Sequence, residues 1–448
     1  MFRKKHSLIK GTLILTSAGL VSRVLGFFFR IFLSHTFGEE QVGLYQLIFP
    51  FYALCLSLST SGLETAISRS VSRFHSLGRT QDGKLIFQTG LILSVLISLI
   101  CTFLVQKNSV FLSNRFLGDP RCATLLHLIV LALPAASVHS CICGYHYGLQ
   151  RTSVPAISQL IEQFVRISSV FVLYFIFIHS GVHPEIPLAV SGIIFGELAA
   201  AGYSLFSLKK GFDADSPYIL SISKSCSELL RLSVPLTVNR TAITFLQGIE
   251  AASIPVCLEL ASHSASEALS IYGVLTGMAL PCILFPCALT NSVSLLLIPA
   301  VAQKQAESSS KETFLLIKKA AGGCFSLGLL CSVFFLLTGS FLGNFLFHST
   351  LAGNFIITLA WICPFLYTSS ALLSAINGLG LTTLTLMINL LGLSIRILSV
   401  YFGIPHYGIT GYLWGLFISQ SAVCLVALLT LSHEIKKEYL QSVESATD

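Results

Sequence analysis

The chain has 448 residues, of which 54% are hydrophobic and only 10% are charged. An average soluble domain carries about 25% charged residues, so this composition excludes a soluble globular protein. We predict an all-α polytopic membrane protein. The net charge of +7 follows from lysines and arginines in the loops, and it gives no reason to expect a nucleic-acid partner.

Twelve apolar segments follow one another along the chain, each near or above the about 20 residues that a helix needs to cross the hydrocarbon core. The first has a longer apolar run than the roughly 7 to 15 residues of a secretory signal peptide, and no small-residue cleavage site follows it. We therefore interpret it as a retained helix. The predicted spans are 11–33, 42–67, 85–106, 123–147, 154–178, 187–208, 229–257, 268–300, 314–342, 352–377, 383–402 and 409–432.

The loops predict the orientation of the chain in the membrane. If the N-terminus is cytoplasmic, the inner loops, the termini and the cytoplasmic ends of the spans hold 19 of the 27 lysines and arginines, the outer loops hold 3 and the rest of the spans hold 5. This distribution obeys the positive-inside rule, so we expect a multi-pass protein of the cell membrane with both termini cytoplasmic. The three exceptions, Lys107, Arg115 and Arg121, all lie in the outer loop between the third and fourth spans.

An internal repeat divides the chain into two halves of six helices. Shifting the sequence by 230 residues superimposes spans four and five on spans ten and eleven without a gap. Because six is an even number, both halves enter the membrane in the same direction, as in transporters built from parallel repeats. The matched pairs include Pro134 with Pro364, Ser140 with Ser370, Gly148 with Gly378 and Arg166 with Arg396.

This repeat predicts the domain organisation. We expect an N-terminal lobe over residues 1–208, a cytoplasmic linker over 209–228, and a C-terminal lobe with a short tail over 229–448. A second, shorter match at an offset of 217 places Arg23 in the first span over Arg240 in the seventh.

Five arginines lie inside predicted spans away from the cytoplasmic ends: Arg23, Arg30, Arg166, Arg240 and Arg396. A charge in the bilayer costs about 3 to 10 kcal/mol or more, so each needs a partner or a wet cavity. Arg23 and Arg30 are seven residues apart, with no acidic residue within four positions of either, which places them about 10 Å apart on one helix face. Two such guanidiniums suit a diphosphate, because each can hold two oxygens as a fork. Alternatively, Arg30 reaches the outer interface and Arg23 pairs with Glu64 or Glu250.

The other arginines differ in their local surroundings. Glu162 and Arg166 have the i, i+4 spacing of a pair along one helix, which favours a structural role. Arg396 has Gly392 where that glutamate would be, so it needs a partner elsewhere, and both a binding and a structural role remain open. Arg240 would face the same central cleft as Arg23 if the shorter repeat is real.

Four glutamates also lie within the spans, namely Glu64, Glu162, Glu197 and Glu250. They are candidates either for binding a coupling H⁺ or Na⁺ or for neutralising the arginines, and the sequence leaves both open. The thirteen cysteines form no zinc-binding pattern. The histidines His127, His139 and His146 show no metal-ligand spacing with a carboxylate, and we interpret them as pore-lining or packed residues. We predict no metal and no cofactor.

Several segments together resemble the stage V sporulation protein B and polysaccharide-export family of the multidrug, oligosaccharidyl-lipid and polysaccharide (MOP) flippase superfamily, which also contains the lipid II flippases. They are 11–20 (GTLILTSAGL), 22–27 (SRVLGF), 42–46 (VGLYQ), 272–281 (YGVLTGMALP) and 297–301 (LIPAV).

The resemblance implies a two-lobe fold like that of the multidrug (MATE) exporters. It also implies a flippase that moves a lipid-linked saccharide to the outer leaflet by alternating access, for cell-wall, spore-cortex or polysaccharide synthesis. By resemblance, Arg23 of the SRVLG motif takes part in cargo recognition. Lipid II flippases look like fourteen-helix proteins with an acidic residue after the second arginine, whereas Ile31 follows Arg30 here, so the saccharide is left open.

Two other functions compete with this hypothesis. The first is an ion-coupled multidrug exporter, which would use the four glutamates. The second is a membrane glycosyl- or prenyl-transferase, which generally needs paired carboxylates that hold a diphosphate through Mg²⁺. Only Asp213 and Asp215 in the linker lie close together, and no phosphate-binding glycine loop occurs. We therefore predict a protein that is not an enzyme, with a lipid-linked saccharide, membrane lipids and H⁺ or Na⁺ as partners. Its candidate helix kinks are Pro134, Pro235, Pro281, Pro286 and Pro364.

Overall fold

The computed structural model describes residues 2–208, 221–261, 263–306 and 310–447, and within these ranges it contains helices and turns but no strand. In lipid every backbone N–H and C=O must be bonded inside the protein, which a helix achieves within one segment. The predicted all-α class is confirmed. The chain forms two compact units, Met1–Ala252 and Ser253–Asp448, which are described separately below.

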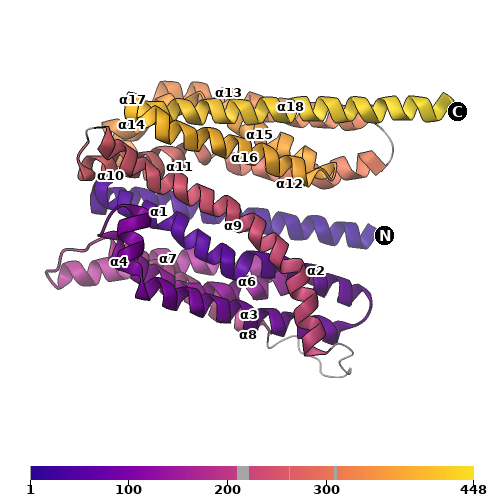
Figure 1. Cartoon of the computed structure of the whole chain (residues 1–448), viewed down its shortest axis with the longest axis horizontal. Coiled ribbons are helices and arrows are strands. Elements are labelled where there is room, and N and C mark those ends of the chain that lie inside the picture. Colours follow the sequence, from indigo (N-terminus) through magenta and orange to yellow (C-terminus); the bar gives the residue numbers. More distant parts are fainter. Residues whose placement is uncertain (1, 209–220, 262, 307–309, 448) are drawn as a thin grey trace. The chain divides into compact units, whose positions relative to one another are not determined.

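The first unit contains the helices of the first half and most of one further helix (Figure 1). Short π-helical or 3₁₀ segments interrupt it at Ser57–Ser61, Ser113–Leu117 and Val130–Ala132. Its helices are α1 (Phe2–Leu56), α2 (Gly62–Ser76), α3 (Thr80–Lys107), α4 (Ser109–Leu112), α5 (Cys122–Ile129), α6 (Leu133–Gly148), α7 (Ser153–His179), α8 (Pro187–Leu208) and α9 (Ile222–Leu260) up to Ala252.

The second unit continues with the remaining helices, interrupted by π-helical turns at Val274–Ala279 and Ser399–Gly403. Its helices are α10 (Ala265–Gly273), α11 (Leu280–Leu284), α12 (Cys287–Ala306), α13 (Ser310–Phe347), α14 (Thr350–Ala360), α15 (Cys363–Gly378), α16 (Thr382–Leu398), α17 (Ile404–Tyr407) and α18 (Ile409–Thr447).

The number of membrane passes agrees with the twelve predicted spans. In the described part of the chain, ten helical segments are long and apolar enough to cross a membrane, and α14 and α15, bent by 56°, together form an eleventh. The first of the ten, Ile14–Ser76, is interrupted at Gly38, where φ is 77°, a conformation that glycine adopts at little cost. The chain turns back there, so the start of α1 and the α2–α3 turn lie at the same end (Figure 1). This segment therefore accounts for two passes.

Equivalent hydrogen bonds recur in both halves at the predicted offset of 230 residues. Thr102 Oγ1 donates to the Val130 carbonyl at 3.0 Å, and Ser332 Oγ donates to the Ala360 carbonyl at 2.7 Å. The repeat therefore extends beyond spans four and five to the third and ninth spans. The two halves are two copies of one helical arrangement.

Matching glycines set the helix packing in the two halves. A Cβ on Gly148 would lie 2.7 Å from the Ser68 carbonyl oxygen, and a Cβ on Gly378 would lie 2.9 Å from that of Ile298. Small residues allow helix backbones to approach closely in membranes. In this way α6 packs on α2, and α15 packs on α12.

The helix α9 packs against the first unit through three polar contacts. Ser57 and Thr241 lie 3.2 Å apart at their hydroxyl oxygens, Ser225 Oγ donates to Thr89 Oγ1 at 3.3 Å, and Arg73 pairs with Glu228 at 2.6 Å. The compact units accordingly divide after Ala252.

The linker itself is described only at its end. Residues 209–220 lie outside the described residues, whereas 222–228 form the first turns of α9 rather than a loop. Which segments move as lobes, 1–208 and 229–448, stays a prediction.

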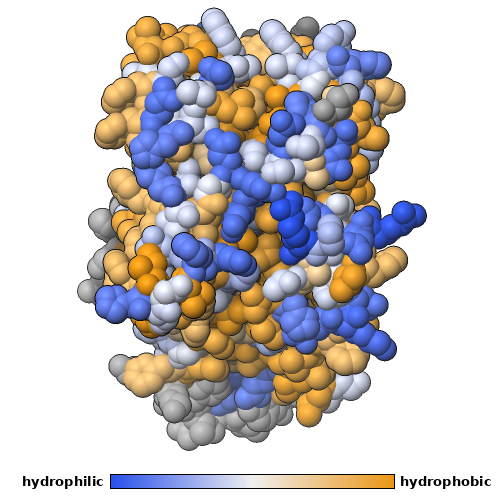
Figure 2. Space-filling model, turned by 90° about the vertical axis from the view of Figure 1, so that its left-hand side faces the viewer, coloured by the Kyte–Doolittle hydropathy of each residue, from blue (hydrophilic) through white to orange (hydrophobic). Residues whose placement is uncertain are grey.

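One of the three basic residues of the predicted outer loop, Arg121, is neutralised by carboxylates close to it. Arg121 pairs with Asp119 at 2.8 Å and with Glu40 at 2.7 Å, and these two carboxylates raise the pKa of its guanidinium. The ion pairs connect the start of α5 to the bend in α1. Figure 2 views the side on which α4 lies in Figure 1, and hydrophilic side chains gather there.

Candidate functional site

Two of the four arginines predicted to bind substrate are exposed in the first unit. Arg23 on α1 and Arg240 on α9 are both exposed, and neither side chain makes an ion pair or hydrogen bond with another described residue. The alternative pairing of Arg23 with Glu64 or Glu250 is therefore not seen. Arg30 and Arg396 are half-buried, and each has an interaction within the described structure.

Arg166 is paired as its spacing predicts. Its guanidinium donates a hydrogen bond to Glu162 within α7, and the side chains of the two residues are only 20% and 19% exposed. The predicted local ion pair is confirmed. This arginine is thus distinguished from Arg23 and Arg240, which have no such partner.

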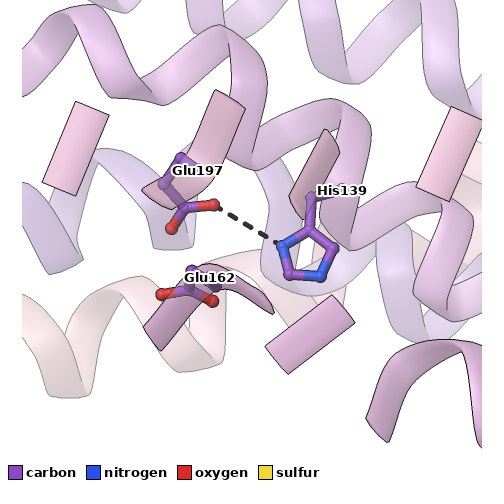
Figure 3. Close-up of side chains that lie close together, drawn as sticks. All are labelled: His139, Glu162 and Glu197. Carbon is purple, nitrogen blue, oxygen red and sulfur yellow. Dashed lines mark ion pairs between the residues drawn. The ribbon is translucent and has the colours of Figure 1, made fainter. Parts of the chain in front are cut away.

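A histidine and two glutamates from three different helices point toward one another in the first unit (Figure 3). His139 on α6 places Nδ1 3.5 Å from Glu197 Oε2 on α8. One ligand atom from each of His139, Glu162 and Glu197 lies within 4.8 Å of the others. The spacing of these residues along the chain showed no metal-ligand pattern. In the tertiary structure, however, the three side chains lie close together.

Glycines on α8 explain why Glu197 lies beside α7. A Cβ on Gly196 would lie 2.8 Å from the Glu162 carbonyl oxygen, and a Cβ on Gly192 would lie 2.4 Å from Val170 Cγ2. Only glycine permits this approach of the two helices. The backbone of α8 therefore carries Glu197, which is 8% exposed, directly to Glu162.

These residues line a cavity of about 300 Å³, which we call the acidic pocket. Glu64 on α2 lines it as well and accepts a hydrogen bond of 2.7 Å from Ser140 Oγ. The Nε2 atom of His139 lies 2.9 Å from Ser158 Oγ. Three of the four predicted glutamates thus meet in one pocket, whereas Glu250, 6% exposed on α9, does not line it.

The acidic pocket has the chemistry of a cation or proton site. Carboxylates and imidazole bind metal cations, and histidine also exchanges a proton near neutral pH. Arg166 already compensates Glu162, so Glu64, Glu197 and His139 remain to bind a further positive charge. The sequence predicted only that His139 lines a pore or packs, and not that it meets the two glutamates; its neighbour Ser140 belongs to the repeat and could have drawn attention to this face of α6.

Comparison with known proteins shows the family to which the chain belongs. A family model described as polysaccharide biosynthesis protein matches residues 8–303. The chain belongs to the polysaccharide biosynthesis protein family. As a member of this family with many apolar helices, it is a multi-pass membrane protein.

Two relatives from Bacillus subtilis (strain 168) show how far the similarity extends. This chain is 29% identical over 435 residues to stage V sporulation protein B, and the match covers 96% of this chain and 84% of the relative. It is 24% identical over 316 residues to the lipid II flippase MurJ, covering 66% of this chain and 58% of that relative.

The fold is also found among solved transporters. A multidrug resistance MATE family transporter of the MOP superfamily superimposes with a TM-score of 0.74 at 14% identity, covering 94% of this chain and 96% of that one. This likeness shows the fold, in agreement with the predicted class. It does not assign the residues that bind a substrate.

Proposed function

We propose that this protein is a flippase that moves a lipid-linked saccharide, carried on a polyprenyl diphosphate, from the inner to the outer leaflet. The product would serve cell-wall, spore-cortex or other polysaccharide synthesis. The family and the two Bacillus relatives support this proposal, since one of them is by name a lipid II flippase.

The observation that carries the proposal is the pair of exposed guanidiniums on membrane-length helices of the first unit. Neither Arg23 nor Arg240 makes a side-chain ion pair or hydrogen bond with another described residue, although the charge of Arg240 acts on Glu64, and a charge facing lipid would cost about 3 to 10 kcal/mol or more. They must therefore face water or an anion. A diphosphate provides several oxygens for such forks, with Arg30 and Arg396 as further candidates for the same role.

Transport against a gradient needs a driving force, and we assign it to the acidic pocket. Glu64, Glu197 and His139 would bind H⁺ or Na⁺, with Glu162 held by Arg166. In this proposal the lobes 1–208 and 229–448, joined by 209–228, move relative to one another, with both termini in the cytoplasm.

Two variants of Arg23 test the proposed contact with the diphosphate. Arg23→Lys keeps the charge but loses the planar two-pronged contact, and Arg23→Ala loses both. In proteoliposomes loaded with a polyprenyl diphosphate disaccharide, we expect no transport by the alanine variant and partial transport by the lysine variant. Both should reach normal abundance, because Arg23 has no buried partner to strand.

Arg115→Ala is the matched control, since Arg115 is exposed in the π-helical segment Ser113–Leu117 that follows α4. It should transport normally. An abundant and fully active Arg23→Ala protein would exclude Arg23 from the mechanism. Depletion of the protein in cells, with analysis of which lipid-linked intermediate accumulates on the inner leaflet, would identify the saccharide.

A multidrug exporter is the second candidate, because the acidic pocket could bind a cationic drug and the fold matches a MATE transporter. The two functions make opposite predictions for lipophilic cations, which exposed arginines should repel. We expect no protection of cells from ethidium-like dyes. Dye efflux that is lost in Glu64→Gln or Glu197→Gln variants would favour the exporter instead.

A further inference from the structure

A second cavity in the first unit is lined by basic side chains, whereas the acidic pocket is lined by glutamates. It has a volume of about 490 Å³ and lies where α2, α3, α6 and α8 end or begin. The two cavities share no lining residue. We call it the basic pocket, and its polar lining includes His75, Thr80, Lys84, Tyr145, His146 and Arg151.

Among the described residues, the lining of the basic pocket contains no carboxylate. Two acidic side chains of the described helices nearby are paired with other arginines: Asp82 with Arg79 at 2.7 Å and Glu228 with Arg73 at 2.6 Å. The guanidinium of Arg151 adds a positive charge to this lining, which favours an anionic ligand.

His146 is the strongest sign that the basic pocket receives a ligand. It is only 4% exposed, and neither ring nitrogen has a hydrogen-bond partner among the described residues. A buried polar group without a partner destabilises a protein. The matching residue of the second half is Ile376, which is 0% exposed, so the packing here does not require a polar side chain.

Arg151 is held beside His146 by the turn between α6 and α7. Its N–H donates to the His146 carbonyl at 2.9 Å, and the Gln150 N–H donates to that of Tyr147 at 3.0 Å, which is a Schellman helix end. The guanidinium is exposed and makes no ion pair with a described residue. The second half has Leu381 at this position.

We propose that the basic pocket binds the phosphate group of an anionic ligand, with His146 donating a hydrogen bond from within and Arg151 holding the phosphate oxygens at the entrance. Such a phosphate belongs either to an anionic phospholipid headgroup or to a soluble phosphate compound. Both are present at the cytoplasmic surface, which this end of the helices is predicted to face. Because the lining comes from several helices, a bound phosphate would stabilise their arrangement.

Binding can be measured on the purified full chain in an uncharged detergent. We would titrate inorganic phosphate in one arm and dioctanoyl phosphatidylglycerol in the other, with dioctanoyl phosphatidylcholine as the zwitterionic control. Saturable binding of phosphatidylglycerol alone would identify a lipid headgroup site. Saturable binding of inorganic phosphate would identify a site for soluble phosphates.

Variants that copy the second half test the two residues. Arg151→Leu and His146→Ile should each weaken binding about tenfold or more, as expected for a lost hydrogen bond to a charged group. His146→Gln keeps an N–H donor and should retain most of the affinity. Arg115→Leu, which removes an exposed arginine from the π-helical segment after α4, should bind like the wild type.

The proposal fails if the unmodified chain binds neither probe saturably. It also fails if Arg115→Leu weakens binding as much as Arg151→Leu, because the attraction would then be unspecific. If His146→Ile does not fold, the binding affinities of the Arg151→Leu and His146→Gln variants still test the proposal.

Discussion

The acidic pocket and the corresponding region of the second half share a framework but differ in charge. In the first half Ser140 Oγ donates to Glu64 at 2.7 Å. In the second half the matching hydroxyls of Ser370 and Ser294 lie 3.0 Å apart. Two further charged residues of the pocket are replaced there by neutral ones, so that Ser369 matches His139 and Gly392 matches Glu162.

This difference separates what the fold needs from what the first half adds. The second half packs the same helices with serine and glycine at the positions of Glu64, His139 and Glu162, so helix packing does not require charged side chains there. The basic pocket shows the same asymmetry, since Ile376 and Leu381 match His146 and Arg151. We infer that the charged residues of the first half were retained for binding.

The largest expected effect comes from breaking the ion pair that only the first half possesses. Glu162→Leu leaves Arg166 buried without its partner and should lower stability by about 3 to 5 kcal/mol, measured as the amount of folded protein in membranes. The double variant Glu162→Leu/Arg166→Met should recover most of that loss. Arg23→Met, at an exposed arginine without a partner, is the control and should leave abundance unchanged. Equal losses for Arg23→Met and Glu162→Leu would contradict the structural role of the pair.

Replacing the matching glycines of the two halves by alanine should lower the stability of the protein to a similar extent. Gly148→Ala and Gly378→Ala each place a Cβ within 3 Å of backbone oxygen, and overpacking of this kind costs about 1 to 3 kcal/mol. Thermal unfolding in detergent should show both losses. Gly202→Ala, where nothing lies within 4 Å of the added Cβ, should show none. A loss confined to one half would argue against a shared framework.

Replacing charged residues of the acidic pocket by neutral ones should remove coupling without unfolding the protein. We expect Glu197→Ala and His139→Ser to reduce the response of transport to an imposed H⁺ or Na⁺ gradient by about tenfold, the size of a typical coupling free energy. Transport down the substrate gradient should continue. Glu259→Ala, at an exposed glutamate on α9, is the control and should keep the full response. If Glu197→Ala and His139→Ser both respond like the wild type, the pocket does not couple transport to an ion.

The smallest effect concerns the turns that end α6 and α15. Gln150 has a φ of 58°, whereas the matching residue is Gly380 with a φ of 81°, and a left-handed conformation costs a residue with a side chain about 1 to 2 kcal/mol. Gln150→Gly should raise the midpoint of thermal unfolding slightly, and Gly380→Gln should lower it. A decrease for Gln150→Gly would mean that the glutamine side chain stabilises its turn.

Several features could be predicted because they depend on residues close together in the chain. Hydropathy marks each span, since lipid excludes an unbonded backbone from its interior. The Glu162–Arg166 pair follows from helical spacing alone. The repeat was visible in spans four and five, where the two copies align without a gap, and the structure extends it to the third and ninth spans through their matching hydrogen bonds.

Other features needed the tertiary structure. His139, Glu162 and Glu197 lie on three helices, and α9 packs with the first unit although it begins the second half of the repeat. Hydropathy tells which residues avoid water but not which helices become neighbours. That choice depends on close backbone approaches at residues such as Gly144 and Gly196, where α6 meets α2 and α8 meets α7. The same approaches bring distant carboxylates into one pocket, so the sequence supplied the charged residues and only the packing decided which of them meet.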